Sequence, residues 1–353
     1  MKKHANIPIF IPHEGCKNEC VFCNQRTITG TCQGSDRDII PEIEKALSTI
    51  PEDFELEIAF FGGSFTGIGT GRMTRLLDCA YEYVKSGKVQ SIRLSTRPDY
   101  IDEQILDTLK CRGVTHIELG IQSMRQHILD ACKRGHTVED TEKACRLINE
   151  YGFILGGQMM IGLPCSTAED EIYTAKRIGE MGAKEARIYP CVVFENTELC
   201  NMAKTGEYEP ISVEEAVIRS TKVYYELKKH KINILRIGLQ SSESLSDKNE
   251  VFAGAYHPAM GELVESRVKL EGMLSAIECY KTEQNFDYHA HPFIVECNKC
   301  DLSKVLGHKK SNVEIIRKAA IDAGFSDISI KTNDKVKQNS LVIHFGQQSE
   351  ISD

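Results

Sequence analysis

The sequence has no apolar run long enough to cross a membrane, no short repeat and no low-complexity linker. None of its hydrophobic stretches reaches the roughly 20 residues that a membrane helix needs. The first residues carry basic Lys2 and Lys3, but Pro8 and Pro12 interrupt the apolar stretch that follows, which is unlike a secretory signal. We therefore expect a cytoplasmic protein that does not bind membranes.

An excess of positive charge is also absent. Across 353 residues, 43 Lys and Arg stand against 51 Asp and Glu, which gives a formal net charge of −8. Proteins that coat nucleic acid along its length need many cations, so this balance argues against that class and leaves room only for a local basic patch. Hydrophobic residues at 41% and charged residues at 27% are ordinary for a globular protein with a large core.

Cysteine, by contrast, is plentiful, with 14 residues. In a short secreted chain this number would predict disulfides, but this chain is long and most of its cysteines stand alone. Two groups have ligand-like spacing: Cys16, Cys20 and Cys23 form one, and Cys297 and Cys300, with His289 and His291 nearby, form the other. The second group could hold zinc or an auxiliary cluster, and chance placement in a cysteine-rich chain is the interpretation we favour.

Short apolar runs alternate with amphipathic stretches over the first 195 residues. The predicted strands are 7–11, 56–61, 92–95, 115–120, 154–161 and 187–193. The predicted helices are 39–50, 73–85, 103–110, 138–151 and 168–181. Asp102 and Thr167 are suited to cap two of these helices. The alternation predicts an α/β fold with helices outside a parallel sheet, and six repeats fit a partial (βα)6 TIM-like barrel.

Two further segments follow this barrel domain of residues 1–195. Residues 196–285 are predicted to be a mostly helical extension of the core with a strand at 232–237. Residues 286–353 have a separate pattern, with strands at 293–296, 328–331 and 341–345 and a helix at 312–323. This pattern predicts a small C-terminal α/β appendage.

The first cysteine group follows the first predicted strand. Iron–sulfur clusters are usually held by four thiolates, so Cys16, Cys20 and Cys23 can hold three irons of a 4Fe–4S cubane. The fourth iron would then be open to a ligand, as in catalytic metal sites. A zinc site would need a fourth ligand from His13, Cys32 or elsewhere. The spacing therefore favours the cluster.

Distinctive short motifs stand at the ends of the later predicted strands, where parallel barrels carry their chemistry. They are Phe-Phe-Gly-Gly-Ser-Phe at 60–65, Ser-Thr-Arg-Pro-Asp at 95–99, Gly-Ile-Gln-Ser-Met at 120–124 and Met-Met-Ile-Gly-Leu-Pro at 159–164. A further motif, Lys-Arg-Gly-His-Thr at 133–137, directly precedes the predicted helix 138–151. Together with the cysteine spacing and Phe22, their order resembles the radical S-adenosylmethionine superfamily. That resemblance implies a barrel enzyme that uses a 4Fe–4S cluster to cleave S-adenosylmethionine reductively and make a 5′-deoxyadenosyl radical.

The resemblance also implies roles for individual residues. The three cysteines would be the catalytic cluster ligands. Gly62 and Gly63 would bind the amino group of S-adenosylmethionine through their backbone, because Ser64 stands where the family has an acidic residue. Gln122 would bind a ribose hydroxyl, and Arg134 the carboxylate. The other implied cofactor contacts are Phe22, Ser64, Ser95, Arg97 and Met160, the last on the strand end where the family packs the adenine.

Residues 6–195 are most similar to one branch of that superfamily. The motifs Gly-Gly-Ser-Phe, Ser-Thr-Arg-Pro-Asp, Glu-Leu-Gly-Ile-Gln-Ser and Arg-Gly-His-Thr resemble the catalytic subunit of elongator and its stand-alone bacterial relatives. Elongator-type enzymes modify wobble uridines of tRNA, so the resemblance implies tRNA as a partner, together with an electron donor such as flavodoxin or ferredoxin. The compact cysteine spacing and the few residues after 286 differ from elongator, and we do not expect acetyltransferase chemistry.

Two other functions are compatible with these motifs. One is a radical enzyme acting on a small molecule or a porphyrin, because the Gln-Ser segment is similar to that of oxygen-independent coproporphyrinogen oxidase. The other is a non-catalytic carrier of haem or of a cluster. Tyr256, His257 and Glu262 are candidates for substrate contacts or for structural roles.

One local feature of the appendage is relevant to RNA binding. Residues 299–318 hold six Lys or Arg against two acids, a surplus of positive charge in an acidic protein. The sequence Gly-His-Lys-Lys at 307–310 partly resembles the Gly-x-x-Gly loop of KH RNA-binding domains, with Lys310 in place of the second glycine. An ordinary solvated surface is the simpler interpretation of the same charges.

Overall fold

The structure is a computed structural model that describes residues 3–11, 15–16, 20–24, 38–51, 53–240, 250–281, 291–345 and 348–352. The chain divides into two compact units, residues 1–258 and 259–353. The domain boundaries expected after residues 195 and 285 stay predictions. Among the described helices, none combines the length and apolar character that a membrane span requires.

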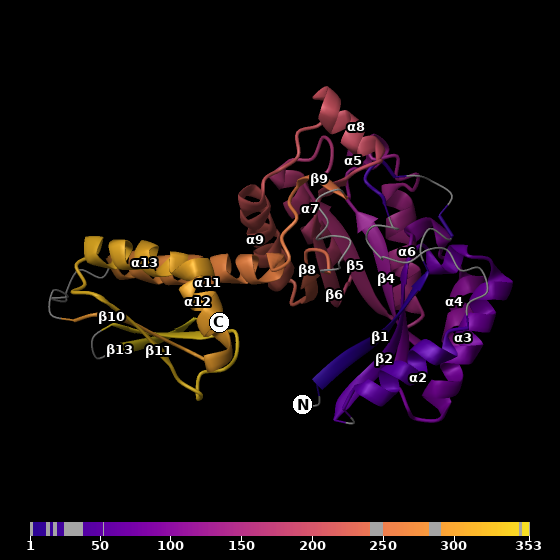
Figure 1. The fold of residues 1–353 in the computed structure, drawn as a ribbon, viewed down its shortest axis with the longest axis horizontal. Coiled ribbons are helices and arrows are strands. Elements are labelled where there is room, and N and C mark those ends of the chain that lie inside the picture. The colour runs from indigo at the N-terminus through magenta and orange to yellow at the C-terminus, as the bar shows by residue number, and fades with distance from the viewer. Residues whose placement is uncertain are drawn as a thin grey trace. The chain divides into compact units, whose positions relative to one another are not determined.

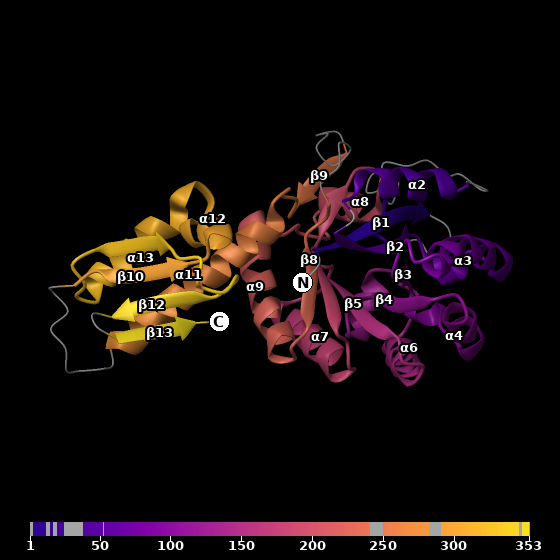
Figure 2. The same ribbon diagram turned by 90° about the horizontal axis from the view of Figure 1, so that it is seen from below.

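The first unit is a curled sheet of seven parallel strands with helices on its outer side (Figures 1 and 2). In spatial order the strands are β1 Lys3–Ile11, β2 Phe54–Gly62, β3 Ser91–Thr96, β4 Val114–Gln122, β5 Ile154–Ile161, β6 Glu185–Pro190 and β8 Asn233–Ile237. The predicted partial barrel is confirmed, and β8, which the sequence predicted as a strand outside it, adds a seventh member.

Helices connect the strands, since parallel neighbours can be joined only by a crossover. They are α2 Ile40–Thr49, α3 Thr70–Lys85, α4 Glu103–Lys110, α5 Gln126–Ala131, α6 Val138–Glu150, α7 Ala168–Glu180, α8 Glu198–Thr205 and α9 Val213–Lys229, with short turns η1 Phe65–Gly67 and η2 Pro98–Tyr100. Asp102 caps α4 by accepting a 2.8 Å hydrogen bond from the Ile105 amide, and Thr167 and Asp170 form a capping box on α7. Both predicted caps are confirmed.

Alternation along the strands separates an apolar layer from a polar interior. Ile92 and Leu94 of β3 are fully buried. Between them Arg93 donates hydrogen bonds to the neighbouring strands, to Glu57 of β2 at 2.7 Å and to Glu118 of β4 at 3.0 Å. Because side chains alternate along a strand, Arg93 points to the opposite face of β3 from Ile92 and Leu94. That face lines the barrel interior, where Arg93, Glu57 and Glu118 form an ionic network.

The strand predicted at 187–193 is two strands, which corrects the sequence expectation. β6 ends at Pro190, and β7 Val192–Phe194 pairs antiparallel with β9 Val251–Gly254 in a separate two-stranded sheet. The break occurs at Cys191, whose amide donates to Ile161 of β5 while its carbonyl accepts from Ala255. The backbone thus changes pairing partner at one residue, which hydrophobicity alone does not reveal.

The second unit packs helices on a four-stranded sheet. Its elements are α11 Met260–Lys281, β10 Phe293–Cys297, η4 Lys299–Asp301, α12 Leu302–Leu306, η5 His308–Lys310, α13 Ser311–Asp322, β11 Ile328–Thr332, β12 Leu341–Phe345 and β13 Gln348–Ser352. The strands lie in the order β11-β10-β12-β13, and β10 is parallel to β11. Met273, Ile277, Phe293 and Ile316 are fully or almost fully buried in its core.

Candidate functional site

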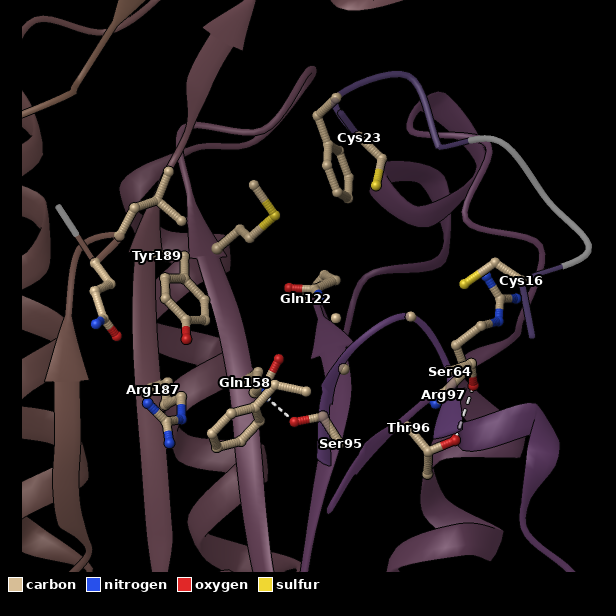
Figure 3. A pocket seen from close by; sticks show the side chains of 18 of the residues that line it. Cys16, Cys23, Ser64, Ser95, Thr96, Arg97, Gln122, Gln158, Arg187 and Tyr189 are labelled. Atoms are coloured by element: carbon tan, nitrogen blue, oxygen red, sulfur yellow. Dashed lines mark hydrogen bonds between the residues drawn. The ribbon is translucent and has the colours of Figure 1, made fainter. Parts of the chain in front are cut away.

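A cavity of about 650 Å³ lies at the carboxyl ends of the strands of the first unit (Figure 3). The chain forms its wall with eleven of the twelve residues that the sequence suggested for the cluster and the cofactor. These are Cys16, Phe22, Cys23, Gly62, Gly63, Ser64, Ser95, Arg97, Gln122, Arg134 and Met160. The twelfth, Cys20, accepts a hydrogen bond from Arg134 of the wall. Residues predicted from separate motifs therefore meet at one place.

Backbone hydrogen bonds hold the segment that carries Cys20 and Cys23. The Val21 amide donates to the carbonyl of Cys132 at 3.2 Å, and the Leu199 amide donates to the carbonyl of Val21 at 2.9 Å. The Cys23 amide in turn donates to the Cys20 carbonyl at 3.0 Å. The ends of α5 and α8 thus fix this segment beside the cavity.

Cys16 is positioned by close contact between its loop and the glycine-rich motif after β2. Gly15 has φ +76°, and a Cβ atom there would lie 2.1 Å from the Ser64 carbonyl oxygen. A Cβ atom at Gly67 would lie 2.3 Å from the Gly15 carbonyl oxygen. Only glycine permits such an approach, which lets the Ser64 amide donate to the sulfur of Cys16.

Two opposing effects act on the pKa of the Cys16 thiol. Burial raises the pKa of the Cys16 thiol, while the positive charges of Arg134 and Arg97 oppose that rise. A thiol in this position gives up its proton when a metal binds, because metals coordinate thiolates. The two guanidinium groups then compensate part of the negative charge.

Both arginines are buried and retain unused donors. Arg97 is 2% exposed and binds Asp99 through Nε, at 2.9 Å, and Nη2, at 3.0 Å. Arg134 donates from Nη1 to Cys20 Sγ at 3.3 Å and from Nη2 to the Gly120 carbonyl at 2.8 Å. Within the described residues, Nη1 of Arg97 and Nε of Arg134 are buried and have no hydrogen-bond partner. Buried donors of this kind are costly unless a ligand satisfies them.

Gln122 is strained in a way typical of binding sites. It ends β4 with φ +66°, where the register of β4 against β5 shifts. Its Oε1 is also buried without a partner among the described residues. A residue other than glycine rarely adopts this conformation, and such positions cluster at functional sites. The amide is therefore available to a hydroxyl or amine of a ligand.

The sequence interpretation missed the opposite wall of the cavity. Gln158 of β5, Arg187 and Tyr189 of β6 and Arg236 of β8 line it. Gln158 and Arg187 interrupt apolar strand sequences, and an inward polar residue in such a strand was the signal that could have identified them.

The residues suggested for substrate contacts are not among those that line the cavity. Tyr256 and His257 belong to the first unit and do not line the cavity. Glu262 lies on α11, which belongs to the second unit. Tyr256 packs against Val192 and Phe194, which line the cavity, so both roles that the sequence left open stay predictions.

Among the described residues, no three His, Cys, Asp or Glu side chains converge as they would around one metal ion. A cubane differs from one ion because each cysteine binds a separate iron. The second pair of cysteines with ligand-like spacing differs in exposure, since Cys297 is fully buried and Cys300 is exposed. His13, Cys32 and His289 lie outside the described residues.

The donors at the cavity fit the cofactors that the sequence implies. Thiols line it on one side, and two buried guanidinium groups with free N–H donors suit a ligand that carries a carboxylate. The free Gln122 oxygen suits an amine or a hydroxyl.

Comparison with known proteins identifies the family of this chain. Residues 10–178 match the model of the radical SAM superfamily, and residues 183–270 match the radical SAM C-terminal domain. The chain belongs to the radical SAM superfamily. Enzymes of this superfamily use a 4Fe–4S cluster and S-adenosylmethionine, as the sequence resemblance implied.

Among radical SAM proteins, the chain is similar to several elongator-like ones. It is 42% identical to a tRNA uridine(34) acetyltransferase of Methanocaldococcus jannaschii over 127 residues, which are 35% of this chain and 24% of that protein. An uncharacterized protein of the same organism is 29% identical over 224 residues, 60% of this chain and 68% of that one. The solved structure of archaeal Methanocaldococcus infernus Elp3 with an N-terminal deletion has a TM-score of 0.60 and 26% identity, covering 77% of this chain and 64% of that one.

These similarities concern only part of each acetyltransferase. The radical SAM chain spans about a quarter of the length of the two curated acetyltransferases from Methanocaldococcus, 24% in one and 28% in the other.

Proposed function

We propose that this radical SAM protein holds a 4Fe–4S cluster on Cys16, Cys20 and Cys23, cleaves S-adenosylmethionine reductively and thereby modifies a uridine of tRNA. The observation that carries the proposal is that eleven residues predicted from separate motifs line one cavity. An electron donor such as flavodoxin or ferredoxin would supply the electron. Relatives that are named for uridine 34 of tRNA support the choice of substrate.

The residues predicted from the sequence motifs each have a part in this function. When bound, the cluster and S-adenosylmethionine supply a carbon-centred radical that removes a hydrogen atom from the substrate. Arg97 and Arg134 would balance the negative charge of the thiolates and hold the carboxylate. Gly62, Gly63 and Ser64 would offer backbone groups to the amino group, while Gln122 and Ser95 would address the ribose. Phe22 and Met160 would shield the reaction from water and pack against the adenine.

The second unit offers independent support for an RNA substrate. The elements β10, α12, α13 and β11 follow one another, and the loop Gly-His-Lys-Lys at 307–310 joins the two helices. Gly307 and Lys310 have φ of +78° and +63°. A helix–loop–helix between two strands is how KH domains present the loop that clamps an RNA backbone. The side chains of His308, Lys309 and Lys310 are exposed, as phosphate contacts require.

Anaerobic reconstitution with iron and sulfide, followed by reduction, tests the proposal. 5′-Deoxyadenosine would be measured by chromatography with and without bulk tRNA. We expect product that rises with tRNA and that is lost in Cys20→Ala. The matched control Cys111→Ala should retain it, because Cys111 is exposed at the end of α4 and does not line the cavity.

Two results would contradict parts of the proposal. If the amount of 5′-deoxyadenosine does not change with tRNA, the radical chemistry would still be supported. The RNA substrate would then be rejected in favour of a small molecule or a porphyrin. A complete cluster that gives no product in either condition would reject the enzyme and support a carrier of haem or of the cluster. In that case haem binding would be measured next.

A further inference from the structure

Three polar side chains on the wall opposite the cysteines have no role in the proposed cofactor site. Gln158 lies on β5, and Arg187 and Tyr189 lie on β6 (Figure 3). All three line the same cavity as Cys16 and Cys23. This wall is therefore available to a second molecule beside the cofactor.

The orientation of the Gln158 amide follows from its neighbours. Its Nε2 atom donates to Ser95 Oγ and to Glu118 Oε2, both at 3.1 Å. Burial opposes ionisation of Glu118, but hydrogen bonds from Arg187 and the charges of Arg187 and Arg93 outweigh it, so the pKa of Glu118 lies below its ordinary value. An ionised carboxylate only accepts hydrogen bonds, so the NH2 group of Gln158 must face Glu118.

The opposite orientation of the amide would place two oxygens against each other. Gln158 therefore presents Oε1, an acceptor, away from Ser95 and Glu118 (Figure 3). No hydrogen bond to this oxygen is formed by the described residues.

Tyr189 presents the complementary group. Arg187 is held by Glu118, with Nε 2.5 Å from Oε2 and Nη2 3.1 Å from Oε1. The phenol oxygen of Tyr189 lies directly above this guanidinium group in Figure 3. A guanidinium group has donors only, so it cannot accept the phenol proton, which is left to be donated to a ligand. The wall thus offers an acceptor, Gln158 Oε1, and a donor, the phenol of Tyr189.

Aromatic rings line the cavity next to these groups. The guanidinium carbon of Arg187 lies 5.2 Å from the ring centre of Phe61, and the ring centres of Phe61 and Phe10 are 6.4 Å apart. Both rings line the cavity, and aromatic side chains are the usual contacts for the face of an unstacked base.

We propose that Gln158 and Tyr189 read the imide edge of a uracil ring, with Gln158 Oε1 accepting from N3–H and Tyr189 donating to the adjacent carbonyl oxygen. Cytosine has no proton at N3 and carries an amino group in place of O4. The hydrogen bond to Gln158 Oε1 could therefore not form, and Tyr189 could donate only to O2. Arg187 and Glu118 act as positioning residues, because they fix the phenol and the amide. This inference deepens the proposed function and rests on it for the choice of uracil.

The test uses nucleosides and the reconstituted, unreduced protein with S-adenosylmethionine bound. Dissociation constants for uridine, cytidine and 3-methyluridine, which lacks the N3 proton, would be measured by ligand-observed NMR titration. We expect the unaltered protein to bind uridine about tenfold more tightly than either analogue, since a buried acceptor without its donor is costly. Gln158→Leu should bring the three constants within about twofold of one another.

Tyr189→Phe separates the two contacts. It should weaken uridine binding several-fold and keep the preference over 3-methyluridine, because Gln158 still reads N3. Gln104→Leu, which alters an exposed glutamine on α4, is the matched control and should bind like the unaltered protein. Iron content and far-UV circular dichroism would establish that each variant is folded and loaded.

The outcomes separate the inference from the proposed function. A preference for uridine that survives Gln158→Leu, or no preference in the unaltered protein, would overturn the inference even if tRNA stimulates 5′-deoxyadenosine formation. A preference that depends on Gln158 would support the inference, and the lack of any stimulation by tRNA would then count against the tRNA substrate alone.

Discussion

Arg134 donates a hydrogen bond from Nη1 to the Sγ atom of Cys20 at 3.3 Å, although the two residues are 114 positions apart in the sequence. The same guanidinium donates from Nη2 to the carbonyl of Gly120, near the end of β4. One planar group therefore connects the cysteine segment to the strand that carries Gln122. A lysine offers a single charged nitrogen and cannot reproduce this fork.

Arg134→Lys should weaken retention of the cluster. Partners of metal ligands typically change metal affinity by 10–100-fold, so we expect about a tenfold loss of affinity. Iron and sulfide content after reconstitution and desalting at graded iron concentrations would measure it. Arg146→Lys, which changes an exposed arginine paired with Glu150 on α6, should retain iron normally. Equal iron retention in both variants would contradict the role of Arg134.

The ionic network inside the barrel should contribute much more to stability than ion pairs on its surface. Glu118 is 1% exposed and binds both Arg93 and Arg187, so Glu118→Gln leaves buried positive charge uncompensated. We expect a loss of about 3–5 kcal/mol in the free energy of unfolding. Glu150→Gln, which removes one partner of an exposed pair, should cost less than about 0.5 kcal/mol. Denaturant titration of both variants would compare them.

His136 should make the protein sensitive to acid. It is 1% exposed, and burial, followed by the charges of Arg134 and Arg97, lowers the pKa of its imidazole to about 3. In the unfolded chain the pKa is about 6.5, so below that pH the unfolded state gains a proton that the folded state does not. The stability present above pH 6.5 is therefore lost as the pH falls toward 3.

Between pH 7 and pH 4.5 this linkage should remove about 2.5 kcal/mol. His136→Gln has no imidazole to titrate, so its free energy of unfolding should fall less over the same interval. Urea titrations at the two pH values would give the difference for each protein. Parallel losses in the variant and the unaltered protein would assign the acid sensitivity to other groups.

The basic loop of the second unit should contribute to RNA affinity. Reversing the charges of Lys309 and Lys310 to Glu should weaken tRNA binding. It should also reduce the slope of log affinity against log salt by about one for each phosphate that the loop no longer neutralises. Lys335→Glu with Lys337→Glu makes the same change in charge at two exposed lysines before β12. If this control weakens binding equally, net charge and not the loop is responsible.

The sequence predicted the parts of the site that lie at strand ends. Apolar periodicity located the strands, and a parallel sheet brings their carboxyl ends together, so Gly62, Arg97 and Gln122 could be expected to meet. The caps of α4 and α7 could also be predicted, because the residues that signal a helix start are local in the sequence.

The opposite wall could not be predicted in this way. Gln158 and Arg187 lie inside strands, and their importance depends on Glu118 of β4, to which both donate hydrogen bonds. The seventh strand was missed as a member of the sheet for a similar reason. Between Pro190 and Asn233 the chain forms β7, α8 and α9, and nothing local in that stretch indicates that β8 returns to the edge of β6.

The close approach of Gly15 to Ser64 and Gly67 has a consequence for protein engineering. The loop of Cys16 and the turn after β2 fit together without space for a single methyl group. A cysteine loop of this kind therefore cannot be transplanted alone into another barrel. The transferable module consists of two segments separated by almost fifty residues, and a designer would have to copy both together with their spacing.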